Sequence, residues 1–198
     1  EGKIEENKVE SIDFKDGIDS IFDKGALDYP AQYTSTSETP TKKWNEVTTK
    51  LKDIDTSKLH YVRVPENHIV IDFDIKGEDG KKSFEKNLAA ASKWPATYAE
   101  LSKSGAGVHL HYIYSGDSSK LSRVYADDIE IKVFKGNSSL RRKLVKCNDL
   151  PIATISSGLP LKGEKMINAE AIKSEKGIRA LIKKNLNKEI HPATKPSI

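Results

Sequence analysis

Two aspartates, Asp72 and Asp74, are separated by a single residue in the strongly apolar stretch 68–75. Side chains alternate between the two faces of a β-strand, so both carboxylates are expected on one face, with Ile71 and Phe73 on the other. Adjacent like charges repel unless a cation lies between them, and Mg²⁺ or Mn²⁺ takes oxygen ligands of this kind. The pair therefore indicates either a divalent metal site or two solvated acids at the edge of a sheet.

A third carboxylate stands in a similar setting further along the chain. Glu130 lies between Ile129 and Ile131, and Lys132 falls on the same face of the predicted strand. On a strand next to the one that carries the aspartates, Glu130 would complete a metal site. The alternative is an exposed strand face that carries one glutamate and one lysine.

A glycine-containing turn leads into a strand with two histidines. Ser104, Gly105 and Gly107 belong to the turn, and His109 and His111 share one face of the predicted strand 108–114. The histidines fit a zinc or iron pair, a set of phosphate or substrate contacts, or half-buried side chains with local hydrogen bonds. The turn fits either an anion cradle of backbone amides or an ordinary hairpin turn.

A basic segment follows the Glu130 strand. Arg141, Arg142 and Lys143 come shortly after Lys132 and Lys135. Guanidinium and ammonium groups bind phosphates, so the segment fits contacts to a triphosphate or to a nucleic-acid backbone. A solvated loop is the alternative.

The hydrophobic pattern predicts the elements that position these residues. Strands are expected over 61–64, 68–75, 108–114, 129–134 and 151–157, with a short strand or turn at 99–102. Helices are expected over 44–59, 83–93 and 168–190, the second with Ser83 as its N-cap. Strands and helices in this order predict an α/β or α+β fold.

The composition limits the classes of protein that the chain can represent. Its 198 residues carry a net charge of +4 and include one cysteine, Cys147, which excludes an internal disulfide and a cysteine-rich zinc knuckle. The apolar runs are far shorter than a membrane-spanning helix, so we expect no association with a membrane. The single cysteine fits a reducing, cytoplasmic location. Residues 131–198 hold fifteen Lys/Arg and five Asp/Glu, whereas residues 1–130 have a net charge of -6. A basic third beside an acidic remainder fits a nucleic-acid partner or a solvated lysine-rich face.

The ordered set of motifs resembles the archaeo-eukaryotic primase superfamily. Asp72-Phe73-Asp74, then the turn that leads to His109, then Glu130 in a short strand are similar to its three motifs. The resemblance covers about residues 44–160 and is greatest to the bifunctional primase–polymerases of phages and plasmids. Each motif alone is unspecific, and their order carries the resemblance.

The resemblance implies an α+β fold: a palm related to the RNA-recognition fold, with an additional N-terminal α/β unit and a C-terminal helix. It implies template-directed nucleotidyl transfer with two divalent metals, Mg²⁺ or Mn²⁺, held by Asp72, Asp74 and Glu130. Nucleotide binding would fall to His109 and nearby residues, namely Ser104, Gly105, Gly107, Lys132, Arg141 and Arg142. The implied partners are nucleoside triphosphates, a single-stranded DNA template or primer–template, and a helicase domain or partner protein.

This interpretation divides the chain into a polar N-terminal segment (1–43), a catalytic domain (44–165) and a basic amphipathic helix with a tail (166–198). The chain starts without Met, so it could be a fragment of a larger protein. His111 lies outside the core pattern of the family. The third motif of this sequence has a glutamate, Glu130, where many members of the family have an aspartate.

Two other functions fit the sequence. Asp72 with Glu130-Ile131-Lys132 matches the Asp…Glu-x-Lys pattern of metal-dependent endonucleases, although the separation is long and the pattern leaves Asp74 and His109 unused. A non-catalytic nucleic-acid-binding module of a replication complex would account for the basic third of the chain.

Overall fold

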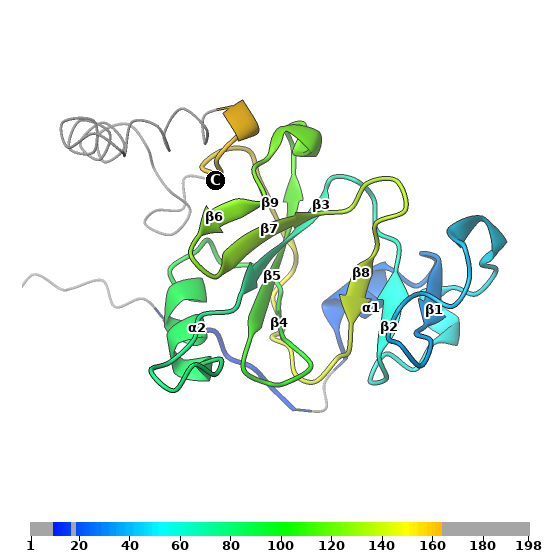
Figure 1. The fold of residues 1–198 in the computed structure, drawn as a ribbon, viewed down its shortest axis with the longest axis horizontal. Coiled ribbons are helices and arrows are strands. Elements are labelled where there is room, and N and C mark those ends of the chain that lie inside the picture. Colours follow the sequence, from blue (N-terminus) through cyan, green and yellow to red (C-terminus); the bar gives the residue numbers. More distant parts are fainter. Residues whose placement is uncertain (1–9, 17–18, 164–198) are drawn as a thin grey trace, which may run out of the picture.

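The computed structural model describes residues 10–16 and 19–163, which form a mixed α+β fold with two sheets (Figure 1). The main sheet has the strand order β4-β5-β3-β7-β6, with every neighbouring pair antiparallel. A sixth strand, β9 (Ala153–Ile155), runs parallel to β5. The other strands of this sheet are β3 (His68–Phe73), β4 (Ala99–Leu101), β5 (Val108–Tyr114), β6 (Val124–Ala126) and β7 (Ile129–Val133).

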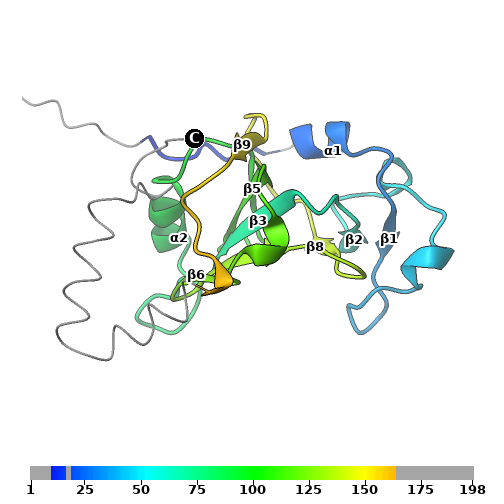
Figure 2. The ribbon, with the colours of Figure 1, turned by 90° about the horizontal axis from the view of Figure 1, so that it is seen from above.

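The second sheet is smaller and antiparallel, in the order β1-β2-β8. Its strands are β1 (Ala31–Tyr33), β2 (His60–Val62) and β8 (Leu140–Arg142). The described residues also form the α-helices α1 (Ile21–Gly25) and α2 (Phe84–Ala91) and the 3-10 helices η1 (Trp44–Glu46), η2 (Leu51–Asp53) and η3 (Ser118–Lys120). Figures 1 and 2 show α2 on one side of the main sheet, and the small sheet with α1 on the other.

Strand β3 is the centre of the main sheet and is buried on both faces over most of its length. Ile69, Ile71 and Phe73 face one hydrophobic core, which also includes Ala91 of α2. Val70 faces the second core, which includes residues of the small sheet and α1. The alternation thus follows the strand period of two, with apolar side chains on both faces because both faces are covered.

Helix α2 fixes the end of β3 and the glycine turn. Ser83 caps the helix by accepting a hydrogen bond from the backbone N–H of Lys86, as expected. Asn87 is fully buried, and its side chain accepts from the N–H of Ile75 and donates to the carbonyl of Ala106. One amide side chain therefore ties the chain segment after β3 to the turn before β5.

The structure confirms the strands predicted near 61–64, 68–75, 108–114, 129–134 and 151–157, and the helix within 83–93. The helix predicted over 44–59 is wrong, because backbone groups there pair with the start of β1 and with the residues just before it. The N–H of Ala31 donates to the carbonyl of Thr49, and the N–H of Leu51 donates to the carbonyl of Tyr29. Only η1 and η2 remain helical in this stretch.

Three strands were not predicted from the sequence, namely β1, β6 and β8. Because β1 pairs with β2, residues from the predicted N-terminal segment belong to the same fold as the predicted catalytic domain. The amphipathic helix predicted over 168–190 lies outside the described residues. Within the part of the chain that is described, no helix is long and apolar enough to cross a membrane.

The two sheets are joined by a buried ion pair between Arg142 of β8 and Glu100 of β4. Nη2 of Arg142 lies 2.7 Å from the Glu100 carboxylate, and the two side chains are each 2% exposed. The hydroxyl of Tyr98 donates to the same carboxylate at 2.5 Å, and Nη2 of Arg142 also lies 2.6 Å from Asp23. Burial is the largest single influence on Glu100 and by itself raises its pKa. The charge of Arg142, the neighbouring His111 and the hydrogen bonds from Arg142 and Tyr98 together outweigh burial and hold that pKa at about 2.

We expect Glu100→Gln to destabilise the fold by about 3–5 kcal/mol, because it leaves the Arg142 guanidinium buried beside a single remaining carboxylate. Urea unfolding at neutral pH measures this free energy. Arg141→Gln, at the neighbouring position, removes an exposed cation and should shift the unfolding midpoint far less. Equal shifts for the two variants would contradict a structural role for the buried pair.

Candidate functional site

Three of the residues predicted to carry chemistry, Asp72, His109 and Glu130, lie in one row across the main sheet. Asp72 of β3 is directly opposite His109 of β5 on one side and Glu130 of β7 on the other. Residues opposite each other in antiparallel strands point to the same face with Cβ atoms about 5 Å apart. The row continues through His109 to Glu100 of β4. Three sequence motifs that lie far apart in the chain are thus adjacent in the fold.

This row lies where the covering layer of the sheet ends. In the preceding row, Val70 and His111 are each 1% exposed and lie beneath the second core. In the next row, the side chains of Asp72 and His109 are 21% and 23% exposed, and that of Glu130 is 37% exposed. A charged row at the margin of a buried layer is accessible to a ligand and only partly solvated.

Asp72 has the least exposed side chain of the three predicted metal ligands. Nε2 of His109 lies 3.2 Å from Oδ1 of Asp72, and Nζ of Lys132 lies 3.5 Å from Oδ2. Burial by itself raises the pKa of Asp72. The hydrogen bond to His109, with the charges of His109 and Lys132, outweighs burial and lowers this pKa to about 2. The carboxylate is therefore ionised throughout the physiological pH range.

The other two carboxylates also face cations. Asp74 lies 3.0 Å from Nζ of Lys82, and Glu130 accepts a hydrogen bond of 2.8 Å from Arg123. Among the described residues, no three His, Cys, Asp or Glu side chains converge on a single point that could hold a metal ion. The structure brings Asp72, Asp74 and Glu130 to one hollow but pairs each of them with a basic side chain.

Acidic and basic hollows meet at this row. One hollow is lined by five carboxylates, those of Asp72, Asp74, Asp127, Asp128 and Glu130. A second is mainly basic and is lined by Lys82, Lys103, Lys132, Arg141 and Lys143 around Asp72 and His109.

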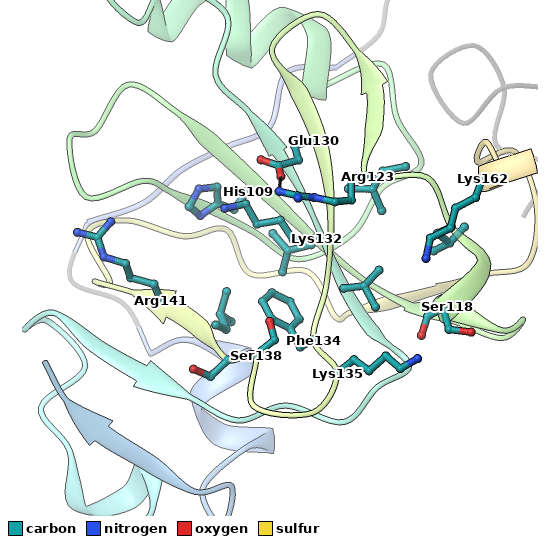
Figure 3. Close-up of a pocket in the computed structure, with 17 residues that line it drawn as sticks. His109, Ser118, Arg123, Glu130, Lys132, Phe134, Lys135, Ser138, Arg141 and Lys162 are labelled. Carbon is teal, nitrogen blue, oxygen red and sulfur yellow. Dashed lines mark hydrogen bonds and ion pairs between the residues drawn. The ribbon is translucent and has the colours of Figure 1, made fainter. Parts of the chain in front are cut away.

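A third hollow, the long groove drawn in Figure 3, borders both of the others. His109, Lys132 and Glu130 lie close together in its middle, and Arg141 and Lys162 lie at opposite ends. The surface therefore places a negative patch next to an extended positive one. Such a surface suits a ligand that brings phosphates and divalent cations together.

The glycine turn is a hairpin turn, and the backbone N–H groups of its glycines donate hydrogen bonds within the turn. The N–H of Gly105 donates to the carbonyl of Ser102, and that of Gly107 donates to Oγ of Ser102. Oγ of Ser104 bonds to Oγ of Ser102. Gly105 has a φ of 81°, which explains the glycine. The amides of Gly105 and Gly107 thus have a structural role in the turn before β5 in place of the predicted nucleotide contacts, whereas the predicted contact of the exposed Ser104 stays a prediction.

Two further assignments change because of burial. Arg142 is 4% exposed and committed to Glu100, so the predicted nucleotide contact is replaced by a structural one, and its segment is a strand instead of a loop. His111 is 1% exposed, and Nδ1 of its ring is 2.8 Å from Nε2 of His68. Burial keeps the pKa of His111 well below its usual value and that of His68 at about 4, so this pair is neutral.

Several residues at the site were missed by the sequence interpretation. Lys82 and Arg123 neutralise Asp74 and Glu130, and Lys103 lines the basic hollow. The position of Arg123 could have been predicted from the sequence, because Asp127-Asp128 is typical of a two-residue turn that joins two strands of a hairpin. That turn forms the β6–β7 hairpin and brings Arg123 beside Glu130.

We expect Gly105→Ala to destabilise the protein by about 1–2 kcal/mol, since alanine is unfavourable in the left-handed conformation. Gly105→Asn should lose less stability, because asparagine tolerates this conformation better. Thermal or urea unfolding distinguishes the two variants. Unchanged stability in both, together with a loss of phosphate binding, would restore the interpretation of the turn as an anion cradle.

The comparisons with known proteins add no family assignment. No family model matches the chain, and no curated protein matches its sequence at a significant level. A functional assignment therefore depends on the row of Asp72, His109 and Glu130 and on the charged hollows around it.

Proposed function

We propose that the chain is the catalytic domain of a DNA primase–polymerase of the archaeo-eukaryotic primase superfamily. It would transfer nucleotides to a growing strand on a DNA template. The observation that carries this proposal is the row His109–Asp72–Glu130, which joins residues from all three motifs on adjacent strands. The acidic and basic hollows that meet at this row are a second support.

The topology of the main sheet also supports the proposal. The chain passes from β3 through α2 to the β4–β5 pair and later to β7, and these strands lie in the order β4-β5-β3-β7. This arrangement matches the first part of the β-α-β-β-α-β unit on which RNA-recognition folds are built. It departs from that unit between β5 and β7, where the described chain has η3 and β6 in place of a second helix.

The donor groups fit the divalent cations that this activity needs. Asp72, Asp74 and Glu130 offer carboxylate oxygens, the ligand type that Mg²⁺ and Mn²⁺ prefer, and all three line the same hollow. We infer that they hold the metal in place of their present partners Lys132, Lys82 and Arg123. When bound, two such ions activate a primer hydroxyl and stabilise the leaving pyrophosphate.

The basic residues beside the carboxylates would act on the phosphates. His109 is oriented by its contact with Asp72, and Lys132 reaches Asp72 from the neighbouring strand. Both would bind the triphosphate of the incoming nucleotide, and Arg141 at the end of the groove would bind a phosphate of the nucleic-acid strand, further from the reacting atoms. The described side chains offer no obvious protein nucleophile at the row, and this chemistry requires none.

A metal-dependent nuclease is the second candidate, and one observation favours it. Nζ of Lys132 is 3.5 Å from Asp72, and Asp72 is opposite Glu130, so the Asp…Glu-x-Lys residues are adjacent in space. This function leaves His109 without a role, although His109 is the other side chain in contact with Asp72. We therefore place it second.

We expect Asp72→Ala and Asp74→Ala each to abolish nucleotide incorporation while the fold is retained. The assay uses labelled primer–template, dNTPs and Mn²⁺, with circular dichroism to check folding. Asp28→Ala removes an exposed aspartate outside the site and should keep full activity.

The same assay separates the two candidates. Shortening of the labelled DNA without dNTPs, lost in the Asp72→Ala variant, would favour the nuclease. Full incorporation by an Asp72→Ala/Asp74→Ala double variant would overturn the proposed site.

We expect His109→Ala to raise the KM for the nucleotide about tenfold or more, the effect of losing a hydrogen bond to a charged group. Its affinity for DNA should change little, because the groove keeps its other cations. Steady-state kinetics and fluorescence anisotropy measure the two quantities. Similar losses in nucleotide KM and in DNA affinity would argue against a specific triphosphate contact.

A further inference from the structure

An ordered loop of the small sheet places one carboxylate on the basic side of the site. The loop follows β1 and is closed by a bridge between Thr34 and Pro40 and by hydrogen bonds between Ser35 and Thr39. At its tip, Glu38 makes ion pairs with Arg141 of β8 and with Lys103, whose Nζ lies 3.1 Å from Oε1 of Glu38. These contacts join residues that lie far apart in the sequence.

The backbone of Glu38 is in an unfavourable conformation. Its φ of 62° falls in the left-handed region, where glycine or asparagine is tolerated better than glutamate. The position is held by a hydrogen bond from the hydroxyl of Tyr61 to the Glu38 carbonyl and by the two ion pairs. Strained positions of this kind cluster at ligand clamps and switch regions. These contacts keep Glu38 in a strained conformation with its carboxylate on two cations at the edge of the groove.

Both cations belong to the hollows of the site. Lys103 and Arg141 line the basic hollow next to Asp72 and His109, and Arg141 also lines the long groove. The Glu38 carboxylate is exposed, so the ion pairs are weak and can be exchanged for another anion. A backbone phosphodiester carries one negative charge and two free oxygens, as a carboxylate does, so it can take the place of Glu38 on the same two cations.

We propose that Lys103 and Arg141 form a binding site for a backbone phosphate of single-stranded nucleic acid, which Glu38 occupies as a stand-in until the strand binds. This inference rests on the proposed function, since it names a contact of the nucleic-acid substrate at that site. Binding of the strand displaces the Glu38 carboxylate and frees the loop.

The length of the basic surface favours a strand over a lone triphosphate. Figure 3 shows Arg141 at one end of the groove and Lys162 at the other, with Lys132 between them. A triphosphate at His109 and Lys132 would leave the ends of this groove empty. Successive phosphates of a strand would engage cations along its length, as in other grooves that bind single strands.

The test measures the affinity of a fluorescein-labelled oligothymidylate of about 20 nucleotides, long enough to fill such a groove. Binding is followed by anisotropy without metal or nucleotide, so the result does not depend on catalysis. Glu38→Gln is compared with Glu46→Gln, which makes the same change in net charge at an exposed position in η1. We expect Glu38→Gln to bind at least about threefold more tightly than Glu46→Gln, because only Glu38 competes with phosphate.

A second set of variants tests the cations. Lys103→Gln and Arg141→Gln should each weaken binding and lower the salt dependence by about one phosphate contact. Glu38→Gln should have no further effect when combined with both substitutions. In a parallel titration, the affinity for dTTP should change little in any of these variants. If the substitutions lowered the affinity for dTTP and not that for the oligonucleotide, Lys103 and Arg141 would be assigned to the nucleotide instead.

The outcomes separate this inference from the proposed function. Equal affinities of Glu38→Gln and Glu46→Gln would overturn the role of Glu38, while nucleotide incorporation could still hold. The expected affinities without any incorporation would support the phosphate site and overturn the polymerase. Absence of oligonucleotide binding by every variant would overturn the phosphate site.

Discussion

The ion pair between Arg142 and Glu100 is the interaction on which the remaining arrangement depends. A buried pair of this kind contributes little net stability, because the desolvation of both charges offsets their attraction. It is specific, however, since neither charge can stay buried without the other. Arg142 lies in the small sheet and Glu100 in the main sheet, so the pair fixes how the two sheets are joined. The same contact also sets the point on the main sheet at which the small sheet stops covering it.

The candidate site is the open continuation of that buried contact. Glu100, His109, Asp72 and Glu130 follow one another along a single row of the main sheet. At Glu100 the row lies beneath the small sheet and is dry, whereas at Glu130 it is partly solvated. Charges in between are desolvated enough to interact strongly, yet they remain within reach of a ligand. The low pKa of Asp72 is one consequence of this position.

The strands with clear alternation could be predicted, and so could the shared face of Glu130 and Lys132 on one strand, because a period of two is a local property. The placement of Asp72 opposite His109 and Glu130 depends on strand order and register, which the period does not give. The buried role of Arg142 could not, since a run of basic residues gives no sign of a carboxylate far away in the sequence. The glycine turn shows the same limit. Its sequence fits an anion cradle as well as the more common hairpin turn, and only the hydrogen bonds to Ser102 decide between them.

In the folded protein, each carboxylate of the candidate site is already paired with a basic side chain. Lys132 and Arg123 neutralise Asp72 and Glu130, so these carboxylates are not free to take a cation at no cost. In the proposed function, Lys132 is also a group that a phosphate would engage. If the phosphate drew Lys132 away, Asp72 would become a better ligand for a divalent ion. By linkage the effect is reciprocal, so nucleotide and metal should each strengthen the binding of the other. A site that exchanges internal ion pairs for substrate contacts thus favours a complete complex over either ligand alone.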